Sequence, residues 1–154
     1  YETSLIALQK LQQAGIKRSI MILLGLGGQA LSESHAHASA RLCSAAEPEY
    51  LSVLTTSFPR GQERVQEGFQ KELGVDFQEL DAREILQELE RFLFQIDLAR
   101  NQTIFRSDHA SNYLVLKGRL GREQGRMLEE LRNVLDAPPD QDAYNLRPEW
   151  SSGL

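Results

Sequence analysis

The sequence predicts an α/β domain built on parallel strands with covering helices. Two short apolar runs, Ser19–Leu24 and Tyr50–Thr55, support this, because continuous runs of this length are typical of strands buried on both faces. Residues 31–46 between them are rich in alanine and other helix formers. A strand, a helix and a second strand in this order form a right-handed crossover, so we expect neighbouring strands whose carboxyl ends share one edge of the sheet.

A further helix is predicted before the first strand. Residues 2–14 have the apolar spacing of an amphipathic helix and are followed by a glycine, a good residue for a helix end. The helix over 31–46 ends before Pro48. After the second strand, a loop containing Pro59 and Gly61 leads into a segment without regular periodicity.

The second half of the chain predicts two more helices and a third strand. Asp81 and Glu84 have the spacing of a capping box at a helix start. An apolar stripe follows them, made of Ala82, Ile85, Leu86, Leu89, Phe92, Leu93 and Ile96. Residues 103–105 predict a strand and residues 127–135 a last helix, which gives one domain over 1–136 and a polar, flexible tail over 137–154.

The predicted sheet is too small to stand by itself. Three parallel strands buried on both faces leave faces and edges without cover, so we expect more strands from sequence preceding Tyr1. The chain starts without methionine and its first residues already have helical spacing, which we interpret as a cut inside a larger protein. An uncovered sheet edge would pair with another chain or aggregate.

Composition limits the function. A length of 154 residues with 41% hydrophobic and 25% charged residues is typical of one soluble domain, and a net charge of -5 argues against a nucleic-acid binder. No apolar run is long enough to span a membrane and no signal peptide is evident, so the chain is expected to be cytoplasmic. The single cysteine, Cys43, excludes an internal disulfide and a multi-thiolate metal site within this sequence.

Three glycines after the first strand form a candidate ligand loop. Gly25, Gly27 and Gly28 could let the main chain approach a phosphate or nucleotide and leave amides free to bind it. They do not complete the dinucleotide-binding pattern of glycines. The alternative is a tight turn from strand to helix that needs positive φ.

A dense polar segment follows the third strand and is the strongest candidate for a binding site. Arg106, Ser107, His109, Ser111 and Asn112 lie within a few positions of each other. We interpret them as the wall of a substrate pocket, with Arg106 binding a carboxylate and the other side chains offering hydrogen bonds. One alternative is a hydrogen-bonded corner that ties the last helix to the sheet, and a weaker one is a hydrolase that uses Ser107 or His109.

The remaining reactive side chains have simpler interpretations. His35 and His37 are two positions apart on a helix, so they face different directions and cannot form a helical metal pair; we expect solvated histidines. Cys43 is expected to be a small buried apolar residue rather than a nucleophile.

The strand Ile20–Gly28, the strand Tyr50–Thr55 followed by Pro59, and the segment from Phe105 to Tyr113 together resemble the C-terminal half of a radical SAM enzyme. The similarity is to a group often described as related to oxygen-independent coproporphyrinogen oxidases, and it covers about residues 1–136. It implies the C-terminal portion of a partial (β/α)6 TIM-like barrel, with the chain supplying its fifth and sixth strands. The missing N-terminal half-barrel would be its partner.

The resemblance also implies cofactors and a site. An intact protein would bind S-adenosylmethionine (SAM) and a [4Fe-4S] cluster, and would cleave SAM reductively to start radical chemistry on an unknown, small-molecule substrate. Aligned on Gly25, the adenine-side motif of the family, G-x-I-x-G-x-x-E, matches only that glycine; Met21, Leu23 and Gly28 stand at its other positions. The implied SAM contacts are Leu23, Gly25, Gly27, Gly28, Thr55 and Pro59, and the substrate contacts are the five polar residues of the segment after the third strand.

One departure from the family decides what this chain can do alone. The family's C-x-x-x-C-x-x-C cluster loop is missing from the sequence, and Cys43 cannot replace three thiolates. We therefore expect no metal ligands and no tight cofactor binding in this chain by itself. The alternative is a non-catalytic half-barrel remnant or interaction module that binds a partner at its sheet edge.

Overall fold

The computed structural model describes residues 1–58, 61–100 and 102–138. Its elements are α1 (Glu2–Gln13), β1 (Ser19–Leu24), α2 (Gly28–Ala46), β2 (Tyr50–Thr55), α3 (Glu63–Leu73), α4 (Ala82–Gln95), β3 (Ile104–Arg106), β4 (Lys117–Arg119) and α5 (Gln124–Asp136). The alternation of helices and strands confirms the predicted α/β class. The predicted tail over 137–154 falls outside the described residues from position 139 onward.

The strands form one sheet in the order β1-β2-β3-β4. The strands β1, β2 and β3 are parallel, and Leu24 is paired with Thr55, which confirms that the carboxyl ends of the first two strands share one edge. The last strand, β4, runs antiparallel to β3 and was not predicted from the sequence. The sheet is therefore mostly parallel, with one antiparallel edge strand.

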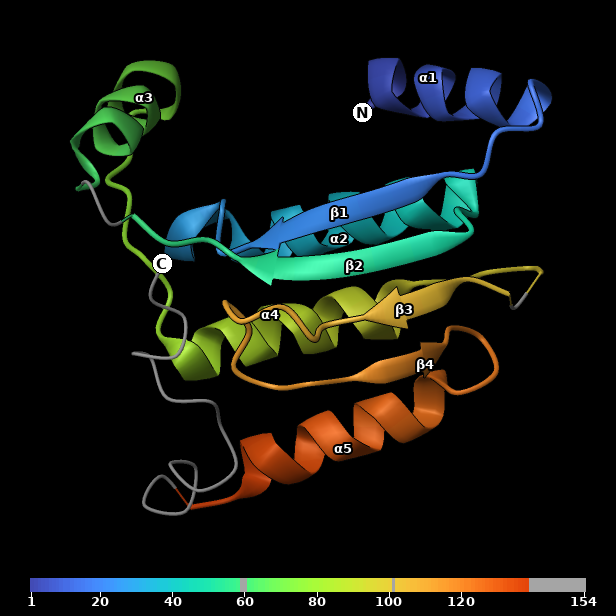
Figure 1. Ribbon diagram of the computed structural model, residues 1–154. Coiled ribbons are helices and arrows are strands. Elements are labelled where there is room, and N and C mark those ends of the chain that lie inside the picture. The colour runs from blue at the N-terminus through green and yellow to red at the C-terminus, as the bar shows by residue number, and fades with distance from the viewer. Residues whose placement is uncertain (59–60, 101, 139–154) are drawn as a thin grey trace.

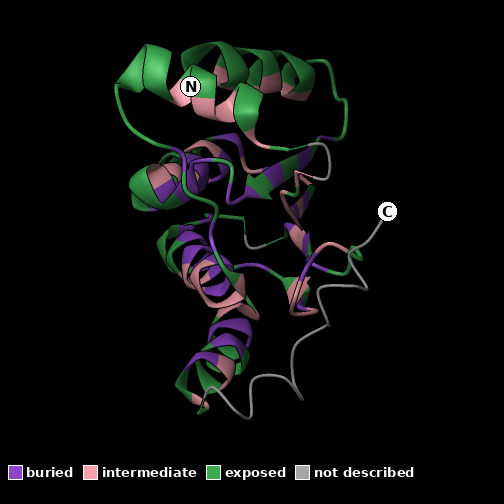
Figure 2. Ribbon diagram, turned by 90° about the vertical axis from the view of Figure 1, so that its left-hand side faces the viewer, coloured by how far each residue is buried: buried purple, intermediate pink, exposed green. Residues whose placement is uncertain are grey.

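The helices cover one face of the sheet. Figure 1 shows α2 and α4 behind the strands and α5 below β4, and Figure 2 shows the helices and the sheet as two layers from the side. In the helix layer α4 packs against both α2 and α5. Helix α1 lies beyond the β1 edge and packs against α2 through Leu5 and Leu8, without a fully buried residue of its own.

The expectation that β1 and β2 are buried on both faces is wrong. Burial alternates along β1: Ile20, Ile22 and Leu24 face the helices, whereas Met21 and Leu23 are 60% and 40% exposed on the other face. The apolar run hides this alternation because the outward positions carry apolar side chains as well. The face opposite the helices, called the open face below, is made of strand residues that point away from α2, α4 and α5.

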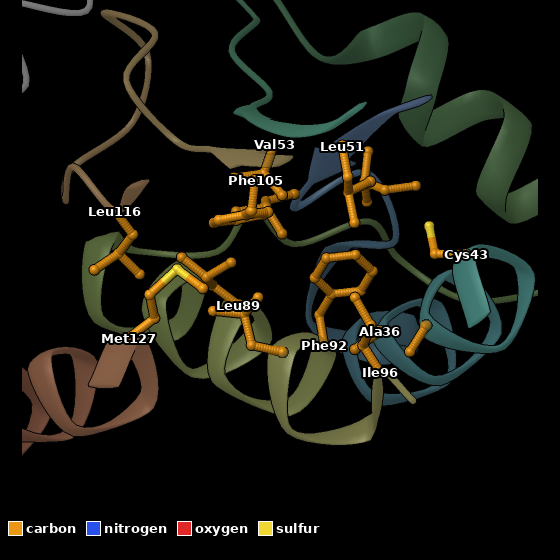
Figure 3. Close-up of a cluster of buried hydrophobic side chains, with 14 of the residues drawn as sticks. Ala36, Cys43, Leu51, Val53, Leu89, Phe92, Ile96, Phe105, Leu116 and Met127 are labelled. Carbon is orange, nitrogen blue, oxygen red and sulfur yellow. The ribbon is translucent and has the colours of Figure 1, made fainter. Parts of the chain in front are cut away.

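The core lies between the sheet and the helix layer. Leu51, Val53 and Phe105 project from the strands toward Leu89 and Phe92 of α4 (Figure 3). Phe92 and Phe105 have no exposed surface, so each contributes a fully buried aromatic ring. The predicted stripe of α4 is therefore the central contact of the fold, and its capping box between Asp81 and Glu84 is confirmed.

Helix α3 occupies a segment for which the sequence predicted no regular structure. None of its residues is buried. Its apolar contact is between Phe69 and Phe77, whose ring centroids are 5.0 Å apart, and Phe77 also contacts Phe58. Within the described residues, none of the helices is long and apolar enough to cross a membrane.

Candidate functional site

The carboxyl ends of β1 and β2 meet in a hydrogen-bonded edge. The carbonyl oxygen of Leu24 accepts from the backbone N–H of Thr56 at 3.0 Å and from its hydroxyl at 2.8 Å. This locks the chain leaving β2 against the turn that leaves β1. In parallel α/β sheets ligands bind at this edge, so the loops that surround it are the first place to look for a site.

The glycine turn after β1 is shaped by internal packing. Gly25 and Gly28 have φ of +79° and +56°, values that favour glycine. A Cβ on Gly25 would lie 2.7 Å from Cδ1 of Ile85, and one on Gly28 would lie 2.8 Å from the carbonyl oxygen of Gln78. A Cβ on Gly27 would crowd Leu31 at 3.1 Å. Packing alone accounts for these glycines, as in the tight-turn alternative.

A buried carboxylate holds this turn in place. Glu88 of α4 is 0% exposed; its Oε1 accepts from the Gly25 N–H at 3.0 Å, and its Oε2 accepts from the Ser32 hydroxyl at 2.6 Å. His35 Nδ1 lies 3.0 Å from Oε1. Burial opposes ionisation, but the hydrogen bonds from His35, Ser32 and Gly25 outweigh it, so the pKa of the Glu88 carboxyl lies below its ordinary value.

Glu88 is the residue of this site that sequence reasoning missed. Its signal was present: it lies three residues after Ile85 and four before Phe92, so it shares the apolar stripe of α4. A charged side chain in such a stripe is buried with partners. His35, expected to be solvated, is instead a half-buried partner of this carboxylate, whereas His37 contacts Gln95 at the surface. Because the Gly25 N–H donates to Glu88, it is not available to bind a ligand.

Two of the five predicted substrate residues have structural roles. Ser107 is 0% exposed, and its hydroxyl donates to the carbonyl oxygen of Leu114 at 2.8 Å and accepts from the Leu116 N–H at 2.7 Å. Asn112 is 3% exposed and its amide donates to the Val53 carbonyl oxygen at 2.7 Å. These bonds close the loop between β3 and β4 over the end of β2, which agrees with the hydrogen-bonded-corner alternative.

Ser111 and His109 lie on the exposed side of the same loop. The Thr55 N–H donates to Oγ of Ser111 at 3.2 Å. Nδ1 of His109 accepts from the Ser111 N–H at 3.2 Å and lies 2.9 Å from Oγ of Ser111. Ser107 is on the opposite, buried side, where its hydroxyl is bonded to Leu114 and Leu116, so it does not pair with His109.

Arg106 ends β3 on the open face, where it lines a pocket of about 390 Å³. Met21 and Leu54 contribute the apolar part of this pocket, and Asp108 and His109 lie at its polar end. A second pocket of about 420 Å³ opens at the carboxyl edge; it is lined by Thr55, Thr56, Ser57, Glu79, Leu80, Asp81, Ser111 and Tyr113. Arg106 and Thr55 thus lie in different pockets.

The predicted SAM contacts are placed in part. Leu23 lies on the open face at the end of β1, next to Leu54 in register, and is 40% exposed. Thr55 lines the edge pocket, and its hydroxyl donates to Oδ1 of Asn112 at 3.2 Å. Pro59 lies outside the described residues. The structure brings Leu23 and Thr55 to the same edge of the sheet, on neighbouring strands.

Metal-ligating groups do not gather in the described part of the chain. Residues 1–58, 61–100 and 102–138 contain no cluster of three or more histidine, cysteine or carboxylate side chains able to hold a metal ion. Cys43 is fully buried in α2, and burial raises its pKa to about 12. This confirms the expectation that Cys43 is a small buried residue of the core. A raised pKa disfavours the thiolate, which is the reactive form of cysteine.

Comparison with protein-family models, with curated proteins and with solved structures found no match to this chain. Its geometry comprises a glycine turn fixed by a buried carboxylate, an apolar open face with a pocket at Arg106, and a second pocket at the carboxyl edge of the parallel strands.

Proposed function

We propose that this chain is the C-terminal half of a radical SAM barrel and contributes to a site that an N-terminal half-barrel completes. The observation that carries the proposal is the one-sided cover of the sheet: helices pack on one face of β1, β2 and β3, and large apolar side chains are exposed on the other. In a barrel, that uncovered face would line the interior, where side chains from opposite strands pack together.

The edge of β1 supports the same proposal. Met21, Leu23 and Tyr50 are among the exposed large hydrophobic residues, and they come from adjacent strands of the open face. Exposed apolar clusters of this kind mark surfaces that another protein segment covers. Helix α1 extends the helix layer past β1, to the place where a preceding parallel strand would lie against it.

The residues at the carboxyl edge fit the apolar part of SAM. Leu23 and Leu54 are register partners on the open face and would contact a planar base, and the hydroxyls of Thr56 and Ser57 line the adjacent pocket. When bound beside a reduced iron-sulfur cluster, SAM supplies the 5′-deoxyadenosyl radical that starts the chemistry of the family. Glu88 has a supporting role in this proposal, because it fixes the turn that borders Leu23.

The residues of this chain do not fit the cluster. The sequence has one cysteine, and that thiol is buried with a raised pKa. Three thiolates would have to come from the N-terminal half. Anaerobic reconstitution of this chain with iron and sulfide is therefore expected to leave it colourless, and a cluster absorbance at stoichiometric iron would contradict the proposal.

The decisive experiment uses the product of the complete reading frame that contains this sequence. It is reconstituted anaerobically, reduced with dithionite, mixed with SAM and assayed for 5′-deoxyadenosine by chromatography and mass spectrometry. Leu23→Asp places a charge on the open face and is expected to reduce the yield, whereas Ile6→Asp, at a position 52% exposed on α1, is the matched control. A product that lacks the three-cysteine motif, or that forms a cluster but no deoxyadenosine, would refute the function.

The second candidate is a non-catalytic half-barrel that serves as an interaction module. The observation in its favour is that the Gly25 amide, Ser107 and Asn112 are all used in internal hydrogen bonds. The same experiment separates the two candidates, because a module would associate with its partner through the open face without forming a cluster. A start codon close to Tyr1, in a frame without the cysteine motif, would favour the module.

A further inference from the structure

We infer that the open face binds an organic oxyanion, with the apolar body of the ligand over β1 and β2 and its carboxylate or phosphate at Arg106. The inference deepens the proposed function, on which it rests, by naming the substrate class of the open face. The inference rests on the charged side chains of the described strands and on the register in which these strands pair.

Cations gather on one half of this face. Register pairing places Ser52 of β2 beside Arg106, and Arg106 directly opposite Lys117 of β4. Arg119 is paired with Ile104 in the next row. Directly paired residues project to the same face of a sheet, so Arg106, Lys117 and Arg119 share the open face.

This grouping is unusual for an acidic protein. The chain has a net charge of -5, yet none of the open-face positions of the four strands is acidic. Like charges directly opposite each other destabilise a strand pair, so the pairing of Arg106 with Lys117 has a cost that a bound anion would offset. The carboxylate of Asp108 forms an ion pair with the Lys117 ammonium at 3.4 Å, which offsets the positive charge of the lysine. Within the described part of the chain, no residue accepts a hydrogen bond or an ion pair from the Arg106 guanidinium.

The pocket at Arg106 has an apolar side and a charged side, as the binding of an amphiphilic ligand requires. It holds about 390 Å³, with Met21 and Leu54 on its apolar side and Arg106 at the boundary with the polar loop. Met21 is 60% exposed and unbranched, so it can adapt to the outline of a ligand. The planar fork of arginine binds carboxylate and phosphate with two parallel hydrogen bonds. An apolar ligand without an anionic group would leave this cation unused.

The test uses three probes with one ring system: naphthoate, naphthyl phosphate and naphthol. Each is titrated into this chain while amide chemical shifts are followed by heteronuclear NMR. We expect naphthoate or naphthyl phosphate to bind saturably and to shift amides around Met21, Ser52 and Arg106. Comparing the two anions identifies the preferred oxyanion. Naphthol is expected to bind at least about tenfold more weakly, because a charge-assisted hydrogen bond contributes more than the ~1.4 kcal/mol that corresponds to tenfold.

Arg106→Gln removes the charge from the pocket, and Arg91→Gln removes an equal charge from the exposed side of α4. The first variant is expected to weaken anion binding about tenfold and the second to leave it unchanged. Near-UV circular dichroism checks that both variants are folded. Equal binding of naphthol and naphthoate, equal binding by Arg106→Gln, or shifts confined to other surfaces would each overturn the inference. So would the absence of saturable binding of either anion.

This test is independent of SAM cleavage. Anion binding that fails while the complete protein still forms 5′-deoxyadenosine overturns the substrate class alone. Anion binding that depends on Arg106 in a protein without radical chemistry supports the anion site and refutes the proposed function.

Discussion

Replacing Glu88 by Gln removes the buried negative charge while keeping the size of the side chain. In the native protein the carboxylate accepts from the Gly25 N–H and Ser32 hydroxyl and is 3.0 Å from Nδ1 of His35. The amide oxygen of glutamine can keep the first of these bonds. Its NH₂ group then faces the Ser32 hydroxyl, which must turn to accept and loses its own acceptor.

The cost of this change follows from the kind of bonds involved. A hydrogen bond to a charged group contributes ~1.5–3 kcal/mol, and a neutral one ~0.5–1.5 kcal/mol. Weakening three hydrogen bonds to a charged group costs several kcal/mol. The glutamine side chain is neutral, so its burial costs less desolvation free energy than that of the carboxylate, and this offsets part of the loss. We expect a net loss of about 2 kcal/mol in the free energy of unfolding.

Urea denaturation followed by circular dichroism measures this loss. With a denaturant slope of about 2 kcal/mol per M for a domain of this size, the midpoint falls by about 1 M. Glu90→Gln on the same helix is the matched control, because Glu90 forms a partly exposed ion pair with Arg132 at 2.6 Å. A surface pair of this kind contributes at most about 1 kcal/mol.

The pH dependence gives a second readout. The pKa of Glu88 is lowered in the folded state, so its stabilising contribution is present above the ordinary glutamate pKa of 4.5 and is lost as the pH falls through the folded pKa. The wild-type protein should therefore lose stability below that pH more steeply than Glu88→Gln. Equal midpoints for Glu88→Gln and the wild type, or an equal effect of Glu90→Gln, would refute the assignment of Glu88 as the anchor of the turn.

Three further predictions concern the core and the loop. The Cys43 thiol, with its pKa raised to about 12, should react with a thiol reagent only on unfolding; rapid reaction with the native protein would contradict its burial. Glu49→Gln should flatten the acid loss of stability, because the Arg18 hydrogen bond lowers the pKa of Glu49 from 4.5 to about 2, and the contribution present above 4.5 disappears as the pH falls toward 2. If Glu49→Gln and the wild type lost stability equally at acid pH in urea denaturation, this prediction would be contradicted. Ser107→Ala should cost ~1–3 kcal/mol in urea denaturation because it leaves a buried amide unpaired. Ser111→Ala, at a half-buried position, should cost under ~1 kcal/mol, and the reverse order would contradict the assigned roles.

Local patterns in the sequence were enough for the main elements. The spacing of Asp81 and Glu84 predicted the start of α4, because a capping box involves only neighbouring residues. The runs ending at Leu24 and Thr55 predicted two parallel neighbours, because a helix crossover leaves few other arrangements. Each of these signals is read within one element or one connection.

The elements that escaped prediction depend on distant contacts. Strand β4 contains Gly118 between two cations and has little strand propensity of its own. It is held beside β3 because Ser107 bonds the backbone of Leu116, nine positions away. Helix α3 has few apolar residues, and its contact with Phe77 joins it to a loop that the sequence alone does not place.

The candidate site shows the same division. The sequence identified the polar segment after β3 but not which side chains turn inward, because that depends on the loop folding over β2. Ser107 and Asn112 are buried, whereas Arg106 reaches the open face. Glu88 could have been found as a charge within an apolar stripe, but its partners, 53 to 63 positions away, could not.

The central place of α4 sets the order in which parts of the protein open. It packs against α2 and α5 and also contacts β1, so it cannot separate without disrupting the whole core. Helices α1 and α3 have no buried residues and can unfold by themselves. Amide hydrogen exchange should therefore be fast in α1 and α3 through local fluctuations, and slowest in α4, where it reports the free energy of global unfolding.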